Sequence, residues 1–170
     1  MLKRTLSLLL LLVPLFSFSQ EVVADDDLYQ DANLIVYKKN TKEKYTGLSQ
    51  VTKGNGHVMS QSKYEQGIIL ETEIYYNKSY RELANKVIYY PDQPYVAQQE
   101  IKYYSNKEGS WQEIKYNNTL GKKIKFETYK NGVLTYQCTY LNGKKHGIEF
   151  CLLSDGSETR VEYNQGKKIK

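Results

Sequence analysis

From about Asn33 onward, the chain alternates tyrosine-rich segments of apolar and polar residues with short turns that contain glycine. Glycine supplies the positive φ that a tight turn needs, and such a turn between two alternating segments predicts a pair of antiparallel strands. The clearest cases are Tyr129-Lys130-Asn131-Gly132, Tyr140-Leu141-Asn142-Gly143, Ser154-Asp155-Gly156 and Tyr163-Asn164-Gln165-Gly166. The pattern therefore predicts a β-hairpin at each of these turns.

The hairpins belong to a longer repeat. Gly-Lys-Lys begins at Gly121, Gly143 and Gly166, so the copies are 22 and 23 residues apart. A fixed period of this length is typical of stacked units, here with two strands in each. In the middle of the chain, tyrosine pairs recur every 14 residues, in Ile74-Tyr75-Tyr76, Ile88-Tyr89-Tyr90 and Lys102-Tyr103-Tyr104.

Polar linkers separate the predicted strands. Pro91-Asp92-Gln93-Pro94 predicts a loop, because proline cannot donate a hydrogen bond to a sheet. Ser79 to Val87 contains helix formers, and we interpret it as strand and loop. The whole pattern predicts an all-β fold for residues 33–170, an elongated antiparallel β-meander of repeated hairpins that forms an open sheet.

Tyrosine dominates the apolar side chains. It accounts for 17 of the 56 apolar residues after residue 19, and the other aromatic residues there are Trp111, Phe126 and Phe150. A sheet without covering helices needs large side chains that tolerate water, and cross-strand tyrosine contacts contribute about 0.2–1 kcal/mol per pair while the hydroxyl stays solvated. So little aliphatic material argues against a thick core with a deep catalytic pocket.

The sequence also lacks the motifs of common catalytic and cofactor sites. It contains no nucleophile elbow, glycine-rich phosphate loop or paired-histidine motif. His57 and His146 both lie in predicted turns, so a metal site would need distant repeats to converge. We therefore predict a protein that is not an enzyme and uses no cofactor or metal.

Residues 1–19 have the pattern of a secretory signal peptide. Lys3 and Arg4 precede an apolar run from Leu6 to Phe18, and Ser17 and Ser19 place small residues before a cut ahead of Gln20. An uncleaved anchor is the alternative, although the run is shorter than the roughly 20 apolar residues that a spanning helix needs. With no cysteine near the cut to accept a lipid, we predict an exported periplasmic or extracellular protein. It would not be a lipoprotein and would have no transmembrane helix in the mature chain.

Residues 20–32 carry three consecutive aspartates, Asp25 to Asp27, and few apolar residues. Composition of this kind predicts a flexible, solvated, acidic lead-in. A calcium site is the other interpretation, but it needs spaced oxygen ligands and usually a glycine to turn the loop.

Several segments resemble a known repeat family. Tyr45-Thr46-Gly47, Tyr64-Glu65-Gln66-Gly67 and Tyr140-Leu141-Asn142-Gly143-Lys144-Lys145-His146-Gly147 are similar to the variant MORN repeats of bacterial proteins, including those classed as antitoxin or immunity-like. The resemblance covers about residues 33–170, with its best copies near the C-terminus and a looser match over residues 70–115. It implies a secreted β-hairpin array that acts in binding, with partners that range from toxins to membranes, and it implies no active site.

The two cysteines, Cys138 and Cys151, lie on successive predicted strands around the Asn142-Gly143 turn. An exported protein can keep a disulfide, and the strand register decides whether these thiols meet. If residues whose numbers sum to 289 face each other, Cys138 lies opposite Cys151. A slip of one residue sends the thiols to opposite faces, so a disulfide and two separate thiols both remain open.

Charge is distributed unevenly along the chain. Residues 101–170 carry 13 Lys and Arg against 7 Asp and Glu, whereas residues 20–100 carry 9 against 12. Stacked Gly-Lys-Lys turns would form a basic stripe flanked by tyrosines, able to meet an acidic partner. The alternative is that these lysines protect exposed turns and edges from aggregation. The predicted stripe comprises Lys122, Lys123, Lys144, Lys145, Lys167, Lys168, Tyr129, Tyr140 and Tyr163.

These observations favour a non-catalytic, exported repeat protein that binds another protein, and the resemblance adds an antitoxin or immunity-like role. The alternative function is an envelope or cell-surface module that binds anionic lipid or polysaccharide through the C-terminal stripe. Nucleic acid is disfavoured as a partner because the protein is predicted to be exported. The identity of the partner and the oligomeric state do not follow from the sequence.

Overall fold

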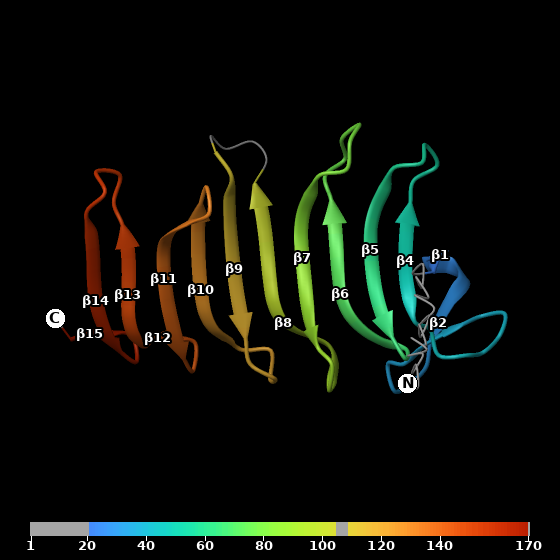
Figure 1. The fold of residues 1–170 in the computed structure, drawn as a ribbon. Helices are drawn as coiled ribbons and strands as arrows, with labels where there is room; N and C mark the ends of the chain where they lie inside the picture. The colour runs from blue at the N-terminus through green and yellow to red at the C-terminus, as the bar shows by residue number, and fades with distance from the viewer. Residues whose placement is uncertain (1–20, 105–108, 170) are drawn as a thin grey trace, which may run out of the picture.

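The protein folds into one long, open β-sheet, seen face-on in Figure 1. The computed structural model describes residues 21–104 and 109–169, so the predicted signal peptide lies outside the described residues. The strands of the sheet are β1 (Val22–Ala24), β4 (Gly47–Thr52), β5 (Val58–Glu65), β6 (Ile68–Tyr75), β7 (Leu83–Tyr90), β8 (Gln93–Tyr104), β9 (Trp111–Asn117), β10 (Lys123–Lys130), β11 (Val133–Leu141), β12 (Lys144–Lys145), β13 (Gly147–Leu152), β14 (Glu158–Asn164) and β15 (Lys167–Lys168).

From β4 onward, each strand pairs with the next one along the chain, except that β11 pairs with both the short β12 and β13, and β12 has no pair with β13. All of these pairs are antiparallel, whereas β1 runs parallel to β4 at the start of the sheet. This arrangement confirms the predicted all-β, open meander of hairpins.

The turns follow the chemistry that their sequences predict. In Asn131-Gly132, Asn142-Gly143 and Gln165-Gly166, both residues have positive φ, with values of 48–51° at the first position and 77–89° at the glycine. Two-residue turns of this type match the right-handed twist of the strands that they join. At Asp155-Gly156 only the glycine has positive φ, and the turn is closed by a hydrogen bond from Leu153 N to Ser157 O (2.8 Å). All four predicted hairpins are therefore confirmed.

The segment with two prolines differs from the predicted loop. Pro91 and Asp92 join β7 to β8, but Pro94 lies within β8. Tyr90 pairs with Gln93 and Tyr89 with Ala97, so a bulge releases the intervening residues from the ladder and removes the need for a proline N–H. Within this bulge Tyr95 adopts a φ of 65°, and its ring lies 5.9 Å from that of Tyr89.

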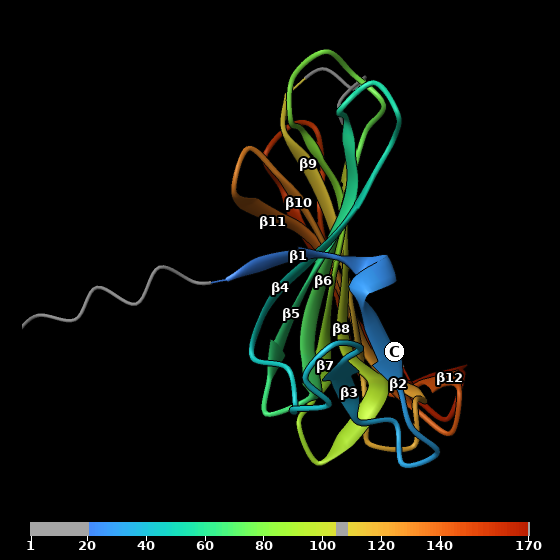
Figure 2. The same cartoon turned by 90° about the vertical axis from the view of Figure 1, so that its right-hand side faces the viewer.

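Residues 20–32 were expected to be flexible, and for residues 22–30 this prediction is wrong. They form β1, a 3-10 turn (Asp25–Asp27) and β2 (Leu28–Gln30), which pairs with β3 (Val36–Lys38). Figure 2 shows this N-terminal cap, residues 21–45, against one face of the sheet. Leu28 and Val36 are buried against Tyr45, Tyr64 and Ile69 because the apolar residues that flank the aspartates meet partners distant in sequence.

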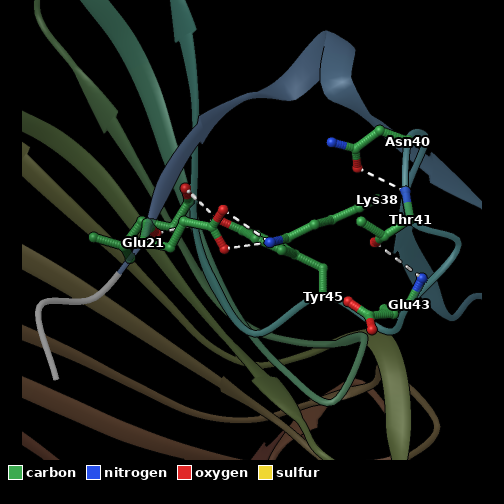
Figure 3. Close-up of polar contacts among 7 residues, drawn as sticks. Glu21, Lys38, Asn40, Thr41, Glu43 and Tyr45 are labelled. Atoms are coloured by element: carbon green, nitrogen blue, oxygen red, sulfur yellow. Dashed lines mark hydrogen bonds and ion pairs between the residues drawn. The ribbon is translucent and has the colours of Figure 1, made fainter.

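Polar contacts hold the cap together and join it to β4, and Figure 3 shows those around Glu21, Lys38 and Tyr45. The Glu21 carboxylate pairs with Lys38 Nζ at 2.5 Å. The fully buried Tyr45 lies beside them, and its hydroxyl donates to Leu48 O at 2.7 Å and lies 3.2 Å from Glu21 O. The start of the sheet is therefore closed both by an extra strand and by a small core.

Beyond the cap, the sheet is a single layer. Among the described residues, the only buried apolar side chains outside the cap cluster are Ala84 and Cys138. No helix among the described residues has the length and apolar character needed to cross a membrane. Most of both faces is consequently open to solvent and to partners.

Candidate binding surfaces

The three Gly-Lys-Lys turns lie along one edge of the sheet. Lys122 is in the turn between β9 and β10, Lys144 and Lys145 form β12, and Lys167 and Lys168 form β15. Figure 1 shows all three turns at the lower ends of the strands. Because neighbouring strands are about 4.8 Å apart, turns two strands apart recur about every 10 Å. We refer to the six lysines at positions 122, 123, 144, 145, 167 and 168 as the basic turn edge.

The two lysines of a turn have different surroundings. Lys123 Nζ lies 3.7 Å from the centroid of the Tyr140 ring, and Lys145 pairs with Glu149 and lies 5.2 Å above the Tyr163 ring. Lys122, Lys144 and Lys167 are exposed, and no ion pair to them occurs within the described residues. The side chain of the second lysine in the first two turns thus packs on a tyrosine ring, while the side chain of the first lysine in all three turns is exposed.

Large apolar side chains accompany these lysines. Leu120, at the tip of the first turn, is 75% exposed. Leu141 ends β11, Ile148 lies near the start of β13 and Ile169 follows β15, and each is also exposed. Exposed apolar groups rimmed by charge are typical of interaction sites, whereas lysines alone would suffice to keep an edge soluble.

The tyrosines of the predicted stripe divide between the two edges. Tyr140 and Tyr163 lie at the basic turn edge, beneath Lys123 and Lys145. Tyr129 does not, since it pairs with Leu134 beside the Asn131-Gly132 turn at the opposite edge. Its inclusion in the stripe was wrong because β10 is long enough to carry Tyr129 away from the lysines at its start.

Carboxylates held by tyrosine and lysine, one of them buried, recur through the sheet, and they were not predicted from the sequence. Glu127 is only 3% exposed, accepts hydrogen bonds from Tyr116 (2.8 Å) and Tyr129 (3.1 Å), and pairs with Lys125 at 2.5 Å. We expected the tyrosine hydroxyls to stay in water. The available signal was the spacing of Glu and Tyr two residues apart, which places both on one face of a strand.

Two further clusters share this design on other strands. Glu149 accepts from Tyr136 at 2.5 Å and pairs with Lys145, and Glu73 accepts from Tyr75 and lies 3.3 Å from Lys86 Nζ. Burial alone would raise the pKa of Glu127, but hydrogen bonds from Lys125, Tyr116 and Tyr129 outweigh it and hold the pKa below its usual value. The pKa of Glu73 and of Glu149 is lowered by the same balance.

The clusters predict a stability plateau bounded on both sides by pH. A carboxyl with a lowered folded pKa contributes stability above its unfolded pKa of about 4.3, and this contribution is lost as the pH falls further. A tyrosine whose pKa is raised in the folded protein also contributes stability, but this contribution is present at lower pH and is lost as the tyrosine ionises at high pH. Burial raises the pKa of Tyr45 to about 12, and the bond to Glu113 raises that of Tyr104 to about 12. Stability should therefore fall as the pH rises above the unfolded value of about 10.

Urea midpoints measured from acid to alkaline pH, with tyrosinate absorbance recorded in parallel, test this expectation. The midpoint should be flat between about pH 5 and pH 10 and fall on either side, with a group of tyrosines ionising only as the protein unfolds. A midpoint that rises below pH 4, or tyrosines that all titrate near their free value in the folded protein, would contradict the role of the clusters.

The cysteines are free thiols, and the register that would place them opposite each other, one of the two that the sequence left open, is not formed. Cys138 is buried and Cys151 half-buried, and the register places Tyr136 rather than Cys138 opposite Cys151. The slip of two residues keeps both thiols on one face but makes them diagonal neighbours. Diagonal positions are about 7–8 Å apart, beyond the usual disulfide separation of about 4.4–6.8 Å between Cα atoms.

Comparison with known proteins adds no assignment. No family model matches the chain, and neither curated proteins nor solved structures give a match. Within residues 21–104 and 109–169, no three His, Cys, Asp or Glu side chains gather in a way that would hold a metal ion. The basic turn edge is therefore the strongest candidate site on the basis of its own geometry.

Proposed function

We propose that this chain is a non-catalytic repeat protein that binds another protein through the basic turn edge. The observation that carries the proposal is Leu120, a large apolar side chain that is 75% exposed at a turn tip and lies two residues before Lys122. An apolar anchor within a charged rim is the usual anatomy of a protein interface. The partner would present an acidic surface with an apolar recess for Leu120.

The setting of this function is also a proposal. The leader pattern of residues 1–19 supports export to the periplasm or beyond the cell. The resemblance to bacterial variant MORN repeats supports a binding role, with an immunity-like role as its most specific form. The recurring hairpins support the same view, because a repeat array offers an extended and accessible contact surface.

Affinity co-purification with tagged residues 20–170 tests the proposal. One protein should be retained from the native envelope or secreted fraction at both low and moderate salt. Leu120→Ser should weaken its binding at least about tenfold, because truncated interface anchors typically cost more than about 1.4 kcal/mol. The matched control is Val133→Ser, which removes a similarly exposed apolar side chain from the opposite edge. A partner bound equally by both variants, or no retained protein, would refute the proposal.

A second candidate is an envelope module whose basic turn edge binds anionic lipid or polysaccharide. The exposed Lys122, Lys144 and Lys167 favour it, since a lysine near an anionic bilayer contributes about 1 kcal/mol. Sedimentation with anionic and neutral vesicles distinguishes the two. Salt-sensitive binding to anionic vesicles alone, lost when all three lysines become glutamine, would support this alternative if no protein is enriched.

A further inference from the structure

The outermost long strands at the two ends of the sheet, β4 and β14, differ in how much of their outer side is paired. At the N-terminal end, β1 covers Leu48, Ser49 and Gln50 of β4. At the C-terminal end, β15 pairs only with Tyr163 and Asn164 of β14, and Ile169 N donates to Glu162 O at 2.8 Å. Within the described residues, the outer side of β14 from Glu158 to Val161 has no neighbouring strand.

The register of β14 shows which backbone groups lie on that open side. The β13–β14 pairing is regular from Gly147 opposite Tyr163 to Leu152 opposite Glu158, and the bond between Leu153 and Ser157 closes its turn. Hydrogen-bonded pairs alternate along antiparallel strands, so the odd-numbered residues of β14 bond to β13. The even-numbered residues face outward, as the bond accepted by Glu162 shows. Glu158 and Arg160 therefore present unpaired N–H and C=O groups, which favour the addition of a strand.

We infer that this open segment pairs with the same segment of a second copy of the chain, antiparallel about Thr159. In this register Glu158 of each copy lies opposite Arg160 of the other. Each of these two positions would exchange two backbone hydrogen bonds, which gives four in total. Opposite charges placed directly across two strands are stabilising, and the interface is self-complementary as a two-fold dimer requires.

Alternative antiparallel registers conflict with the structure. With Arg160 opposite Arg160, like charges meet and Glu158 faces Glu162, whose outer side Ile169 already occupies. With Glu158 opposite Glu158, like charges meet again. In the proposed register Glu162 faces Gly156, which lies in the turn before β14 and not in the strand, and nothing lies within 4 Å of the position that a Cβ on Gly156 would take. The side chains of Glu158 and Arg160 are 53% and 61% exposed, so both are accessible for pairing across the interface. Within one chain their charged groups form an ion pair, with 3.1 Å between Glu158 Oε2 and Arg160 Nη2.

The dimer would continue the sheet from one copy into the next. Its two-fold axis is perpendicular to the sheet, because antiparallel strands are related by such an axis. The basic turn edges of the two copies would consequently lie at opposite strand-end edges of the joined sheet, while the same face of each copy would point to the same side. This inference does not rest on the proposed function, because it uses a different edge and different residues.

Sedimentation velocity of residues 20–170 over a range of concentrations tests the inference. The unchanged protein should form dimers. Glu158→Arg and Arg160→Glu should each raise the dimer dissociation constant about tenfold or more, since each places like charges opposite each other. The double exchange, Glu158→Arg with Arg160→Glu, should restore the dimer, and Glu65→Arg is the matched control on an exposed position far from β14.

The double exchange makes the result decisive. All of these positions are exposed, and circular dichroism confirms that each variant is folded. A protein that stays monomeric at its highest soluble concentration would overturn the inference. Dimers that withstand both single reversals, or that the double exchange fails to restore, would overturn it as well.

Discussion

Tyr45→Ala should lower the free energy of unfolding by about 3–5 kcal/mol, the range for removing a large buried aromatic side chain. Tyr45 is fully buried at the centre of the cap cluster, and its ring lies 5.7 Å from that of Tyr64. Its backbone also joins the cap to the sheet, since Tyr45 N donates to Val36 O and Tyr45 O accepts from Gly67 N. The loss should appear in urea unfolding followed by circular dichroism.

Two further substitutions separate packing from hydrogen bonding at this site. Tyr45→Phe keeps the ring and removes the hydroxyl that donates to Leu48 O, so it should cost only about 1–3 kcal/mol. Tyr80→Ala, at a tyrosine that is 60% exposed, should change stability by no more than about 0.5 kcal/mol. Equal effects of Tyr45→Ala and Tyr80→Ala would show that the cap does not stabilise the protein.

Gly67→Ala should destabilise the protein by about 2–5 kcal/mol, because two costs add there. Gly67 has a φ of 80°, a left-handed conformation that costs a residue with a Cβ about 1–2 kcal/mol. A Cβ would also lie 2.5 Å from Ile35 Cγ2 and 2.8 Å from Val36 O, and overpacking of this kind costs about 1–3 kcal/mol. Urea unfolding measures the sum.

The control for Gly67 is a glycine with the same backbone but open surroundings. Gly143 has a φ of 77°, and nothing lies within 4 Å of the position that its Cβ would take. Gly143→Ala should therefore cost only the conformational part, about 1–2 kcal/mol. If Gly67→Ala lowers the free energy of unfolding no more than Gly143→Ala does, the cap is not closely packed against the β5–β6 turn.

The turns were predictable from sequence because their causes are local. Asn142-Gly143 dictates a tight hairpin whatever surrounds it, and the 22- to 23-residue period places every Gly-Lys-Lys turn an even number of strands apart. An even number of antiparallel strands returns the chain to the same edge. The open meander and the alignment of the lysines both follow from this parity.

The cap was not predictable because its causes are distant in sequence. Val23 and Leu28 flank three aspartates, so any local window of the sequence has the composition of a solvated tail. Their burial depends on Tyr64 and Ile69, more than 35 residues further along the chain. A pattern of apolar residues at both ends of an acidic run is the weak signal that was available.

The different surroundings of the paired lysines and the register of the cysteines were not predictable, because contacts with neighbouring hairpins determine both. The sequence identifies Lys122 and Lys123 as equivalent, whereas the Tyr140 ring of a neighbouring strand holds only the second of them. The cysteine register was also decided by a neighbour. Thr139 accepts a backbone hydrogen bond from His146, and between this point and Tyr136 the pairing shifts by two residues. Such contacts between hairpins leave no trace in the spacing of residues along one hairpin.

The one-sided cap gives the sheet a mechanical polarity. Its two ends, at Glu21 and Ile169, lie at opposite extremes of the strand order, so tension between them acts across the strands rather than along them. The backbone hydrogen bonds between neighbouring strands would break one after another when they are loaded in this direction. Under load, β14 and its neighbours would peel away in steps of one hairpin, and the cored end around Tyr45 would yield last.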